Sequence, residues 1–396
     1  MKTNTYQPLR GIRILDCTRL LPYQYCTLVL GDLGAEVLKV EEPIEGDYGR
    51  WGDVSRTYES AAFVMANRNK KSMKLNLKTE KGKEIFKTLA ATYDVLVESF
   101  RPGVMNRLGL GYEAISRVNP GIIYCSATGY GQTGAYRHKA GHDINYLSIS
   151  GILAWTGEQT GRPVIPAVPF GDMAGGGLFS ALAVIAALLG RERTGKGQYV
   201  DVAQTDVLTS LNILNLAECV AKKKGQTARP HNLRGGTLCY NTFKTLDDKF
   251  IALGALEPKF WANFCKKIKR EDLLEKRLLP YEEGNEATEE LKCLFASKTQ
   301  REWVEFFGSD DVCFSPILTP EETLEDVHLR ERGMITTMDD SNRREKTQLG
   351  FPAKFSDGLN FKRSPAPFFG EHTVEILTDL GFSSSEIETL RKQGII

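Results

Sequence analysis

The feature that most constrains the fold of this 396-residue chain is the regular alternation of short apolar strands and helices in its first third. Residues 12–18 (IRILDCT), 36–41 (EVLKVE) and 94–98 (DVLVE) have the length and composition of buried strands, and helical patterns follow at 22–33 and after Thr79. Successive parallel strands need a crossover connection, which is usually a helix. We therefore predict an α/β fold whose Rossmann-like parallel sheet has helices on both faces.

The pattern changes near residue 222 and predicts two domains. An apolar helix is expected over 173–190 and a long helix over 206–221, and the run 222–226 (KKKGQ) then interrupts the periodicity. Beyond it, strands expected at 237–245 and 250–253 indicate a hairpin, with helices following. We predict a large α/β domain at 1–222 that is completed by 334–396, a linker at 223–236, a small α+β domain at 237–318 and a return linker helix at 319–333.

Composition and charge argue against several classes of function. The 51 basic and 50 acidic residues nearly cancel, and a net charge of +1 argues against a nucleic-acid-binding surface. The eight cysteines form no CxxC pair and the five histidines show no metal-ligand spacing with them, so no metal site is expected. No apolar run is expected to span a membrane, and the first residues do not resemble a signal peptide. We therefore expect a cytoplasmic protein without a membrane or nucleic-acid partner.

A glycine motif at 129–134 (GYGQTG) matches the G-x-G-x-x-G fingerprint of dinucleotide-binding folds and follows an expected strand. The fingerprint requires a helix whose N-terminal amides face the pyrophosphate. The next residues, 135–141 (AYRHKAG), are polar and have no helical period, and the turn after the first strand contains no glycine. We interpret 129–134 as a loop and predict no nicotinamide or flavin site.

Three short stretches carry residues that can move a proton. His142 lies in 141–146 (GHDINY), Asp172 precedes three glycines at 175–177, and Glu257 precedes a proline. Each has an alternative structural explanation, namely a buried histidine beside a helix cap, an N-cap aspartate and a glutamate that starts a helix. The glycines weaken a helix start, which indicates close approach of either another helix or a ligand.

Together these residues place one imidazole and two carboxylates on loops or helix starts, where α/β enzymes hold their reactive groups. Removal of a proton beside a thioester carbonyl requires a base, and it requires hydrogen-bond donors for the enolate oxygen. Inversion of that carbon requires a second acid on the opposite face. Backbone amides that follow Asp172 are suitable donors. The three residues suit this reaction, and their spacing leaves the structural alternatives open.

The stretches GHDINYLSISGIL, FGDMAGGGLFSALAVIAALL, RTGKGQYVDV and LGALEPKF resemble the α-methylacyl-CoA racemase branch of the family III CoA-transferases (CaiB/BaiF), and the likeness extends over nearly the whole chain. The resemblance implies an interlocked homodimer whose active sites lie between the large domain of one subunit and the small domain of the other. It also implies a two-base 1,1-proton transfer in 2-methylacyl-CoA thioesters, with His142 and Glu257 on one face and Asp172 on the other. Coenzyme A would be part of the substrate, and no separate cofactor is expected.

Recognition of coenzyme A calls for cations near the strand ends, because its nucleotide carries a 3′-phosphate and a pyrophosphate. The cations that fit are Lys39, Arg68, Lys70, Lys71 and Arg101, and for a single surface lysine a solvated position is an equal alternative. The resemblance adds two segments that contact the acyl-CoA in the racemases. They are Leu75, Asn76, Leu77 and Lys78, and Gly141, Asp143, Ile144, Asn145 and Tyr146.

The chain departs from the racemase pattern at two places. Glu42 stands where the racemases usually have an arginine before the proline that ends the second strand, which puts a phosphate contact there in doubt; Lys39 is a substitute. The segment 45–69 is longer than in animal racemases and looks more like that of the family's transferases.

The family's transferases are the main alternative. There the aspartate that matches Asp172 is a nucleophile that forms an anhydride and then a thioester with coenzyme A. A transferase needs neither His142 nor Glu257, and both are present here, so we favour the racemase. A third interpretation, a non-catalytic acyl-CoA-binding protein, would leave all three residues without a role.

Overall fold

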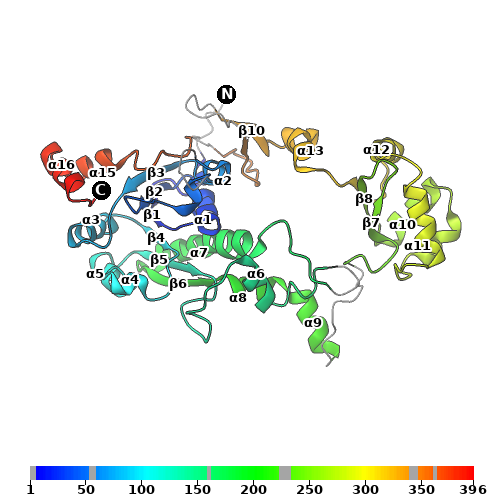
Figure 1. Cartoon of the computed structure of the whole chain (residues 1–396), viewed down its shortest axis with the longest axis horizontal. Helices are drawn as coiled ribbons and strands as arrows, with labels where there is room; N and C mark the ends of the chain where they lie inside the picture. Colours follow the sequence, from blue (N-terminus) through cyan, green and yellow to red (C-terminus); the bar gives the residue numbers. More distant parts are fainter. Residues whose placement is uncertain (1–5, 53–58, 158–161, 223–232, 339–346, 360–363) are drawn as a thin grey trace. The chain divides into compact units, whose positions relative to one another are not determined.

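The computed structural model describes residues 6–52, 59–157, 162–222, 233–338, 347–359 and 364–396. The chain divides into two compact units, and each is described by itself (Figure 1). The large unit comprises Met1–Leu153, Ile165–Lys222 and Glu331–Ile396, and the small unit comprises Ala154–Val164 and Lys223–Arg330.

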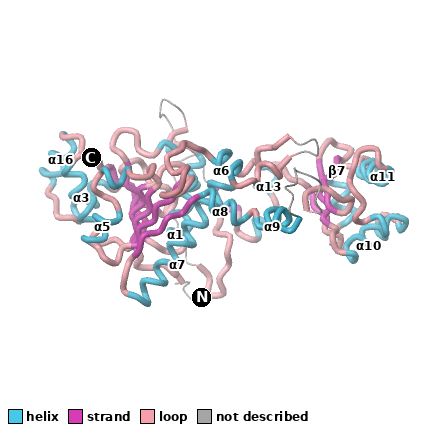
Figure 2. Tube along the Cα trace, turned by 90° about the horizontal axis from the view of Figure 1, so that it is seen from below, coloured by secondary structure: helices cyan, strands magenta, loops and turns pink. Residues whose placement is uncertain are grey.

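A six-stranded parallel sheet forms the centre of the large unit (Figure 2). Its strands are β1 (Arg13–Cys17), β2 (Glu36–Glu41), β3 (Lys70–Lys74), β4 (Val95–Glu98), β5 (Ile123–Thr128) and β6 (Gln198–Ala203). Their order is β3-β2-β1-β4-β5-β6, so the chain starts in the middle of the sheet and adds strands to one side and then to the other. The carboxyl ends of neighbouring strands meet at one edge, where Cys17 lies beside Glu98 and Glu98 beside Ser126.

The two faces of this sheet carry separate apolar cores, because successive residues of a strand point to opposite faces. Leu15 and Leu38 belong to one core, and Ile14 and Val37 belong to the other. This arrangement confirms the predicted α/β class with helices on both faces. The first core includes α3 (Glu80–Ala90), α5 (Tyr112–Val118), α15 (Thr373–Asp379) and α16 (Ser384–Lys392), and the second includes α1 (Leu21–Asp32) and α7 (Phe179–Thr194).

Shorter elements connect these layers of the large unit. Strands β10 and β11 form an antiparallel pair apart from the main sheet. The shorter elements are η1 (Tyr48–Arg50), α2 (Ala61–Ala66), α4 (Val104–Arg107), α6 (Asp143–Ile149), η2 (Gly171–Leu178), α8 (Gln204–Leu211), α9 (Ile213–Lys222), β10 (Ile335–Thr337) and β11 (Thr347–Leu349).

Two helices that were expected to be continuous are interrupted. The helix expected over 206–221 is α8 and α9, because the Asn212 side chain donates to the Ser150 carbonyl at 2.9 Å and its backbone leaves the helical region. The helix within 319–333 is α13 (Pro320–Glu325) and α14 (Val327–Glu331), because the Asp326 carboxylate accepts the Leu329 N–H and starts a second helix. Asn and Asp side chains that bond in this way compete with helix continuation.

The apolar helix expected over 173–190 begins with a π-helix, η2, which continues directly into α7. The combined helix, Gly171–Thr194, is long and apolar enough to cross a membrane, which corrects the expectation that the chain has no such run. Core helices satisfy the same criterion, and the glycines of η2 are buried against α1 and α8. The helix is therefore weak evidence for a membrane span.

The small unit contains an antiparallel sheet and an aromatic core. Its strands are ordered β7-β8-β9, and the first two form the predicted hairpin. Trp261, Phe264, Phe295, Trp303 and Phe307 are buried and lie ring against ring. The elements are β7 (Tyr240–Lys244), β8 (Phe250–Gly254), α10 (Pro258–Lys267), η3 (Glu271–Lys276), α11 (Glu286–Phe295), α12 (Gln300–Phe307) and β9 (Phe314–Pro316), followed by α13.

Candidate active site

The histidine of the GHDINY motif lies at the N-terminus of α6. Its backbone N–H donates to Asn145 Oδ1 at 3.0 Å, and the Tyr146 hydroxyl donates to the Gly141 carbonyl at 2.5 Å. These two hydrogen bonds anchor the end of the preceding loop to α6. The His142 side chain itself is exposed, which excludes the alternative of a buried structural histidine. An exposed imidazole on a well-anchored helix start can take up and release protons.

Asp143 joins this motif to the glycine-rich motif. Its carboxylate accepts the backbone N–H groups of Gly171 and Asp172, the latter at 3.1 Å. These are N–H groups at a helix start, where no partner exists within the helix. A Cβ on Gly171 would lie only 2.7 Å from Asp143 Oδ1, so this approach requires glycine. Two motifs that are 29 residues apart are thereby held side by side.

The carboxyl group of Asp172 is suited to proton transfer near neutral pH. Its pKa is raised to about 6, chiefly by burial and then by the Asp143 carboxylate, while the His142 charge and a hydrogen bond from Gln204 oppose the rise. Because the Asp143 carboxylate accepts the Asp172 N–H, the neighbouring His142 lies in the same part of the large unit. Acid–base catalysis is most efficient when the pKa of the group lies near the working pH.

The glycines after Asp172 allow other helices to approach η2 closely. A Cβ on Gly176 would lie 2.9 Å from Pro22 Cβ of α1 and 2.9 Å from Gln204 Nε2 of α8, and a Cβ on Gly177 would lie 3.0 Å from the Pro22 carbonyl. Of the two explanations for these glycines, the structure therefore supports contact with neighbouring helices. The π-helical winding is also notable, because such segments are rare and occur frequently at functional sites.

A cleft of about 440 Å³ opens at the carboxyl edge of the sheet. Ligands of parallel α/β folds bind outside this edge. The segment 75–78, which follows β3, lines the cleft as the resemblance implies for a coenzyme A contact. Sequence reasoning missed two other lining residues, Arg19 and Phe100, whose only signal is their position after β1 and β4. The Arg19 guanidinium lies 5.1 Å from the Tyr48 ring and 5.5 Å from the Phe100 ring.

Two of the predicted phosphate contacts are buried in ion pairs. Lys39 Nζ lies 2.8 Å from Asp47 Oδ2 and donates to the Thr18 carbonyl. Arg68 forms two hydrogen bonds with Asp32, at 3.0 and 2.5 Å. A charge in the interior needs a partner, and these two cations already have one. We therefore do not retain Lys39 and Arg68 among the proposed phosphate contacts.

The other predicted cations differ in exposure. Lys70 is buried, and its Nζ donates to the Thr27 hydroxyl at 2.8 Å. Lys71 is half exposed and pairs with Glu375 at 2.6 Å. Arg101 is exposed, and its charge acts against the burial that raises the pKa of Tyr146 to about 12. Arg101 follows β4 and so lies at the carboxyl edge of the sheet.

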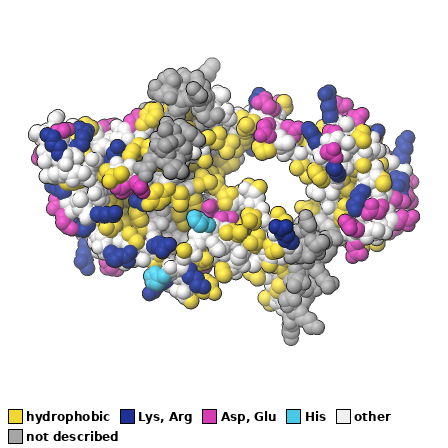
Figure 3. Space-filling model, in the orientation of Figure 1, with side chains coloured by type: hydrophobic (Ala, Val, Ile, Leu, Met, Phe, Trp, Pro, Cys, Tyr) yellow, Lys and Arg dark blue, Asp and Glu magenta, His cyan; other side chains and the backbone are white. Residues whose placement is uncertain are grey.

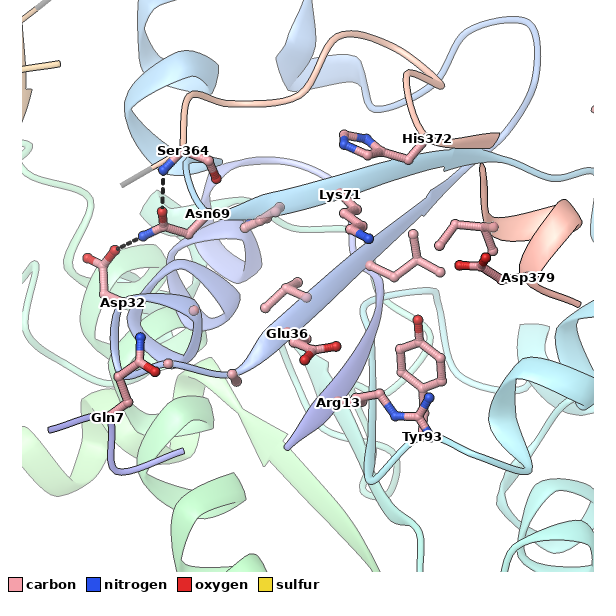
Figure 4. Close-up of a pocket in the computed structure, with 17 residues that line it drawn as sticks. Gln7, Arg13, Asp32, Glu36, Asn69, Lys71, Tyr93, Ser364, His372 and Asp379 are labelled. Carbon is pink, nitrogen blue, oxygen red and sulfur yellow. Dashed lines mark hydrogen bonds between the residues drawn. The ribbon is translucent and has the colours of Figure 1, made fainter. Parts of the chain in front are cut away.

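A larger cavity, of about 580 Å³, lies at the opposite edge of the sheet (Figure 4). Arg13, Glu36 and Lys70, each the first residue of a strand, line it together with Lys71. Figure 4 shows Arg13 beside Tyr93, and its guanidinium lies 5.1 Å from the centre of that ring. Because the amino ends of the strands form this cavity, we do not assign acyl-CoA binding to it.

The glycine motif at 129–134 is a loop, as predicted. Gly131 and Gly134 have φ angles of 83° and 80°, which favour glycine. A Cβ on Gly129 would collide with the Tyr146 ring, so glycine at this position allows the ring to pack against the loop. Residues 135–142 are described and contain no helix, so the loop does not lead into a helix as the fingerprint requires.

Glu257 lies in the small unit at the N-terminus of α10. Its backbone is extended and Pro258 begins the helix, as the sequence predicts. Its side chain makes no capping hydrogen bond with a described residue and is exposed, so capping does not account for a carboxylate here. His142 and Asp172 thus lie together in the large unit, and Glu257 belongs to the small unit.

Comparisons with known proteins place the chain in a family. Residues 9–373 match CoA-transferase family III, and the chain belongs to that family. It is 38% identical to the alpha-methylacyl-CoA racemase of Homo sapiens, covering 98% of this chain and 97% of the relative. It is 36% identical to the succinyl-CoA:glutarate CoA-transferase of Mus musculus, covering 99% and 91%. The crystal structure of a CAIB/BAIF family protein from Brucella suis has a TM-score of 0.81 and 30% identity, covering 95% of this chain and 100% of that chain.

The chain is therefore an enzyme of a family that acts on acyl-CoA thioesters. Racemases and CoA-transferases of this family are about equally similar to it. The family alone does not choose between the two reactions, because one fold supports several chemistries.

Proposed function

We propose that this enzyme interconverts the epimers of 2-methylacyl-CoA thioesters. The observation that supports this most directly is the pairing of an exposed His142 with an Asp172 whose pKa is raised to about 6. A nucleophilic aspartate benefits from being ionised and needs no imidazole. A two-base reaction instead requires one group to hold a proton while the other lacks one, and an imidazole beside a carboxyl group whose pKa is raised to about 6 suits that requirement.

In the proposed reaction, one group removes the proton at C2, and the electrons of the C–H bond move into the thioester carbonyl to form an enolate. Backbone N–H groups stabilise the negative oxygen. The enolate electrons then return to C2, which takes a proton from the group on the opposite face. Asp172 is the base for one epimer and the acid for the other. His142, paired with Glu257, is the acid when Asp172 is the base, and the base when Asp172 is the acid. One proton enters the enzyme and one leaves, so no co-reactant is needed.

We propose that the cleft at the carboxyl edge holds the nucleotide of coenzyme A. Phe100 and the stacked Arg19 offer a flat surface for an adenine ring. Lys78, which lines the cleft and is exposed, and Arg101 are free to approach phosphate oxygens. The motif 141–146 would then contact another part of the acyl-CoA, as the family resemblance implies.

We propose that the enzyme acts as a homodimer. Apolar side chains along η2, α7, α8 and α9 are exposed, with Leu182 at 57% and Leu214 at 63%, and apolar groups cover much of the large unit in Figure 3. Contiguous exposed apolar surface marks an interface. In the interlocked dimer that the resemblance implies, Glu257 completes the site beside His142. Besides Leu182 and Leu214, the exposed large apolar residues of these four helices are Leu178, Phe179, Leu189, Leu211, Ile213, Leu216 and Val220.

Isotope exchange tests the proposed function. One epimer of a 2-methylacyl-CoA is incubated with the enzyme in deuterium oxide, and mass spectrometry with chiral separation follows the product. We expect deuterium at C2 and formation of the other epimer. Asp172→Ala should abolish formation of the other epimer, whereas Asp206→Asn, a change at an exposed aspartate in the first turn of α8, should leave exchange and epimer formation unchanged. An absence of exchange together with coenzyme A transfer to a free carboxylic acid would overturn the proposal.

A CoA-transferase is the second candidate, supported by the 36% identity to a transferase over nearly the whole chain. In that reaction the Asp172 carboxylate attacks the thioester carbonyl and the coenzyme A thiolate leaves, which gives an acyl anhydride. The thiolate then attacks the aspartyl carbonyl and releases the donor acid, and an acceptor acid reverses both steps. Hydroxylamine would trap the aspartyl thioester at Asp172, and His142→Ala would retain activity.

A further inference from the structure

Gln204, the first residue of α8, is a buried polar side chain beside Asp172. The residue is 2% exposed, and its Nε2 donates to the Tyr23 hydroxyl oxygen at 3.0 Å. Hydrogen bonding from this side chain also opposes the rise in the pKa of the Asp172 carboxyl group. A Cβ on Gly171 would lie 3.6 Å from Oε1 and a Cβ on Gly176 would lie 2.9 Å from Nε2, so the amide lies against the π-helix that carries Asp172.

The other half of this amide is unsatisfied. Among the described residues, no donor forms a hydrogen bond with Gln204 Oε1, although the atom is buried. A buried acceptor without a partner costs about 1–3 kcal/mol. Such a cost is unusual in a packed interior, and unsatisfied buried groups often reflect a functional requirement.

We propose that Gln204 is a positioning residue that holds the Asp172 carboxyl group in both of its protonation states, with Nε2 donating to the carboxylate and Oε1 accepting from the protonated acid. Rotation of the amide by half a turn exchanges the two atoms, which are nearly equal in size. Tyr23 tolerates either orientation, because its hydroxyl accepts from Nε2 in one and donates to Oε1 in the other.

This role deepens the proposed racemase function and rests on it. A racemase uses Asp172 as a base for one epimer and as an acid for the other, so the carboxyl group must keep its place whether or not it carries a proton. A lysine or arginine at this position would hold only the ionised form. A neutral amide holds both. Thus Gln204 would help both directions of the reaction without favouring either.

Replacement of Gln204 by methionine, which has a similar length and forms no comparable hydrogen bond, tests the proposal. In Gln204→Met we expect kcat to fall about 10- to 100-fold, because a loosely held group loses its alignment with C2, while KM stays within about twofold. Loss of the hydrogen bond that lowers the Asp172 pKa should also move the rising limb of the pH profile to higher pH.

Gln300→Met is the matched control. Gln300 is also the first residue of a helix, α12, and is also buried, but its amide donates to the carbonyls of Phe250 and Ile317 in the small unit. We expect this variant to lose stability and keep the pH profile of the parent. Tyr23→Phe, which removes only one hydroxyl, should shift the profile in the same direction as Gln204→Met but less.

Infrared titration of the Asp172 carboxyl band, assigned by its loss in Asp172→Asn, separates this inference from the proposed function. We expect a higher Asp172 pKa and a different carbonyl frequency of the protonated acid in Gln204→Met. If the band and the pH profile are unchanged in that variant, the positioning role is wrong even if the parent enzyme exchanges C2. If the parent exchanges nothing, the racemase proposal fails, and a change in the band still shows that Gln204 holds Asp172.

Discussion

Asp143 and Asp172 show how surroundings separate two identical side chains. The Asp143 carboxylate accepts two backbone N–H groups and so organises the site. The Asp172 carboxyl lies deeper beside that first carboxylate, and its pKa is raised to about 6. Burial raises the pKa of both carboxyl groups, but the two backbone N–H donors oppose the rise at Asp143. Two carboxyl groups with different partners can take different roles in acid–base catalysis. At the scale of the residue, we therefore assign a structural role to Asp143 and the chemical role to Asp172.

Single substitutions should separate proton exchange at C2 from inversion of that carbon, because exchange needs one of the two groups and inversion needs both. In Asp172→Asn, the group on the other face can still remove the C2 proton from one epimer and return a deuteron to the same face. We expect slow deuterium incorporation into that epimer without inversion. In His142→Ala we expect the same behaviour with the opposite epimer. Exchange by both variants in the same epimer, measured by mass spectrometry after chiral separation, would contradict the assignment of the two groups to opposite faces.

The raised pKa of Asp172 should lower the stability of the enzyme at neutral pH. Between the pKa of the unfolded chain, near 4, and about 6, the folded protein binds more protons than the unfolded chain, so stability falls as pH rises through this window. Asp172→Asn removes that loss. We expect it to raise the free energy of unfolding by about 1 kcal/mol at pH 7.5, a value reduced for the solvent that reaches the group. Urea denaturation should show no such gain at pH 4.

At the scale of the element, the π-helix η2 is the structure that connects packing with chemistry. It places Asp172 at its first turn and presents glycine backbone to α1 and α8. Because the glycines of η2 allow α1 and α8 to approach closely, Asp172 is held between these two helices. We infer that the packing of η2 and the position of Asp172 change together.

Gly176→Ala tests this coupling. The added methyl group would meet Pro22 Cβ and Gln204 Nε2 at 2.9 Å, so we expect a loss of about 1–3 kcal/mol in stability together with reduced C2 exchange. Gly190→Ala in α7 is the matched control, since its methyl group would meet only Gln198 Nε2 at 3.8 Å. There we expect a gain of about 0.5–1 kcal/mol from better helix propensity and unchanged exchange. Equal behaviour of the two variants in thermal unfolding and exchange would refute the coupling.

At the scale of the whole molecule, the parallel sheet determines which edge carries the site. The carboxyl ends of the strands meet at the cleft lined by 75–78, and the amino ends form the larger cavity of Figure 4. The small unit carries Glu257 on a separate core. The proposed catalytic set is therefore drawn from two folding units, which makes subunit exchange an informative experiment.

Co-expression of His142→Ala and Glu257→Ala chains with different affinity tags tests the interlocked homodimer. If each site takes His142 from one subunit and Glu257 from the other, the mixed dimer contains one intact site and one site that lacks both residues. Random pairing should then restore roughly a quarter of the parent rate of epimer interconversion. Each variant alone should form none of the opposite epimer. No recovery in purified mixed dimers would show that both residues of a site come from the same chain.

Local pattern predicted much of the fold. The strand at 36–41 matches the expected bounds, because its apolar pattern is encoded by neighbouring residues. The loop at 129–134 was also recognised, since the residues after it cannot form the required helix. Sequence reasoning could not find the break at Asn212, because the partner of its side chain, Ser150, is distant in the chain.

The α/β class, the family resemblance and the residue types able to move a proton could all be predicted before folding, because they depend on local periodicity and short motifs. Which charged side chains remain available to a ligand depends on the folded chain. It buried Lys39 against Asp47, and it set Asp143 against the backbone of Asp172. A burial or a contact between distant segments arises from packing of the whole chain, and packing is also what raises the pKa of the acid proposed to do the chemistry.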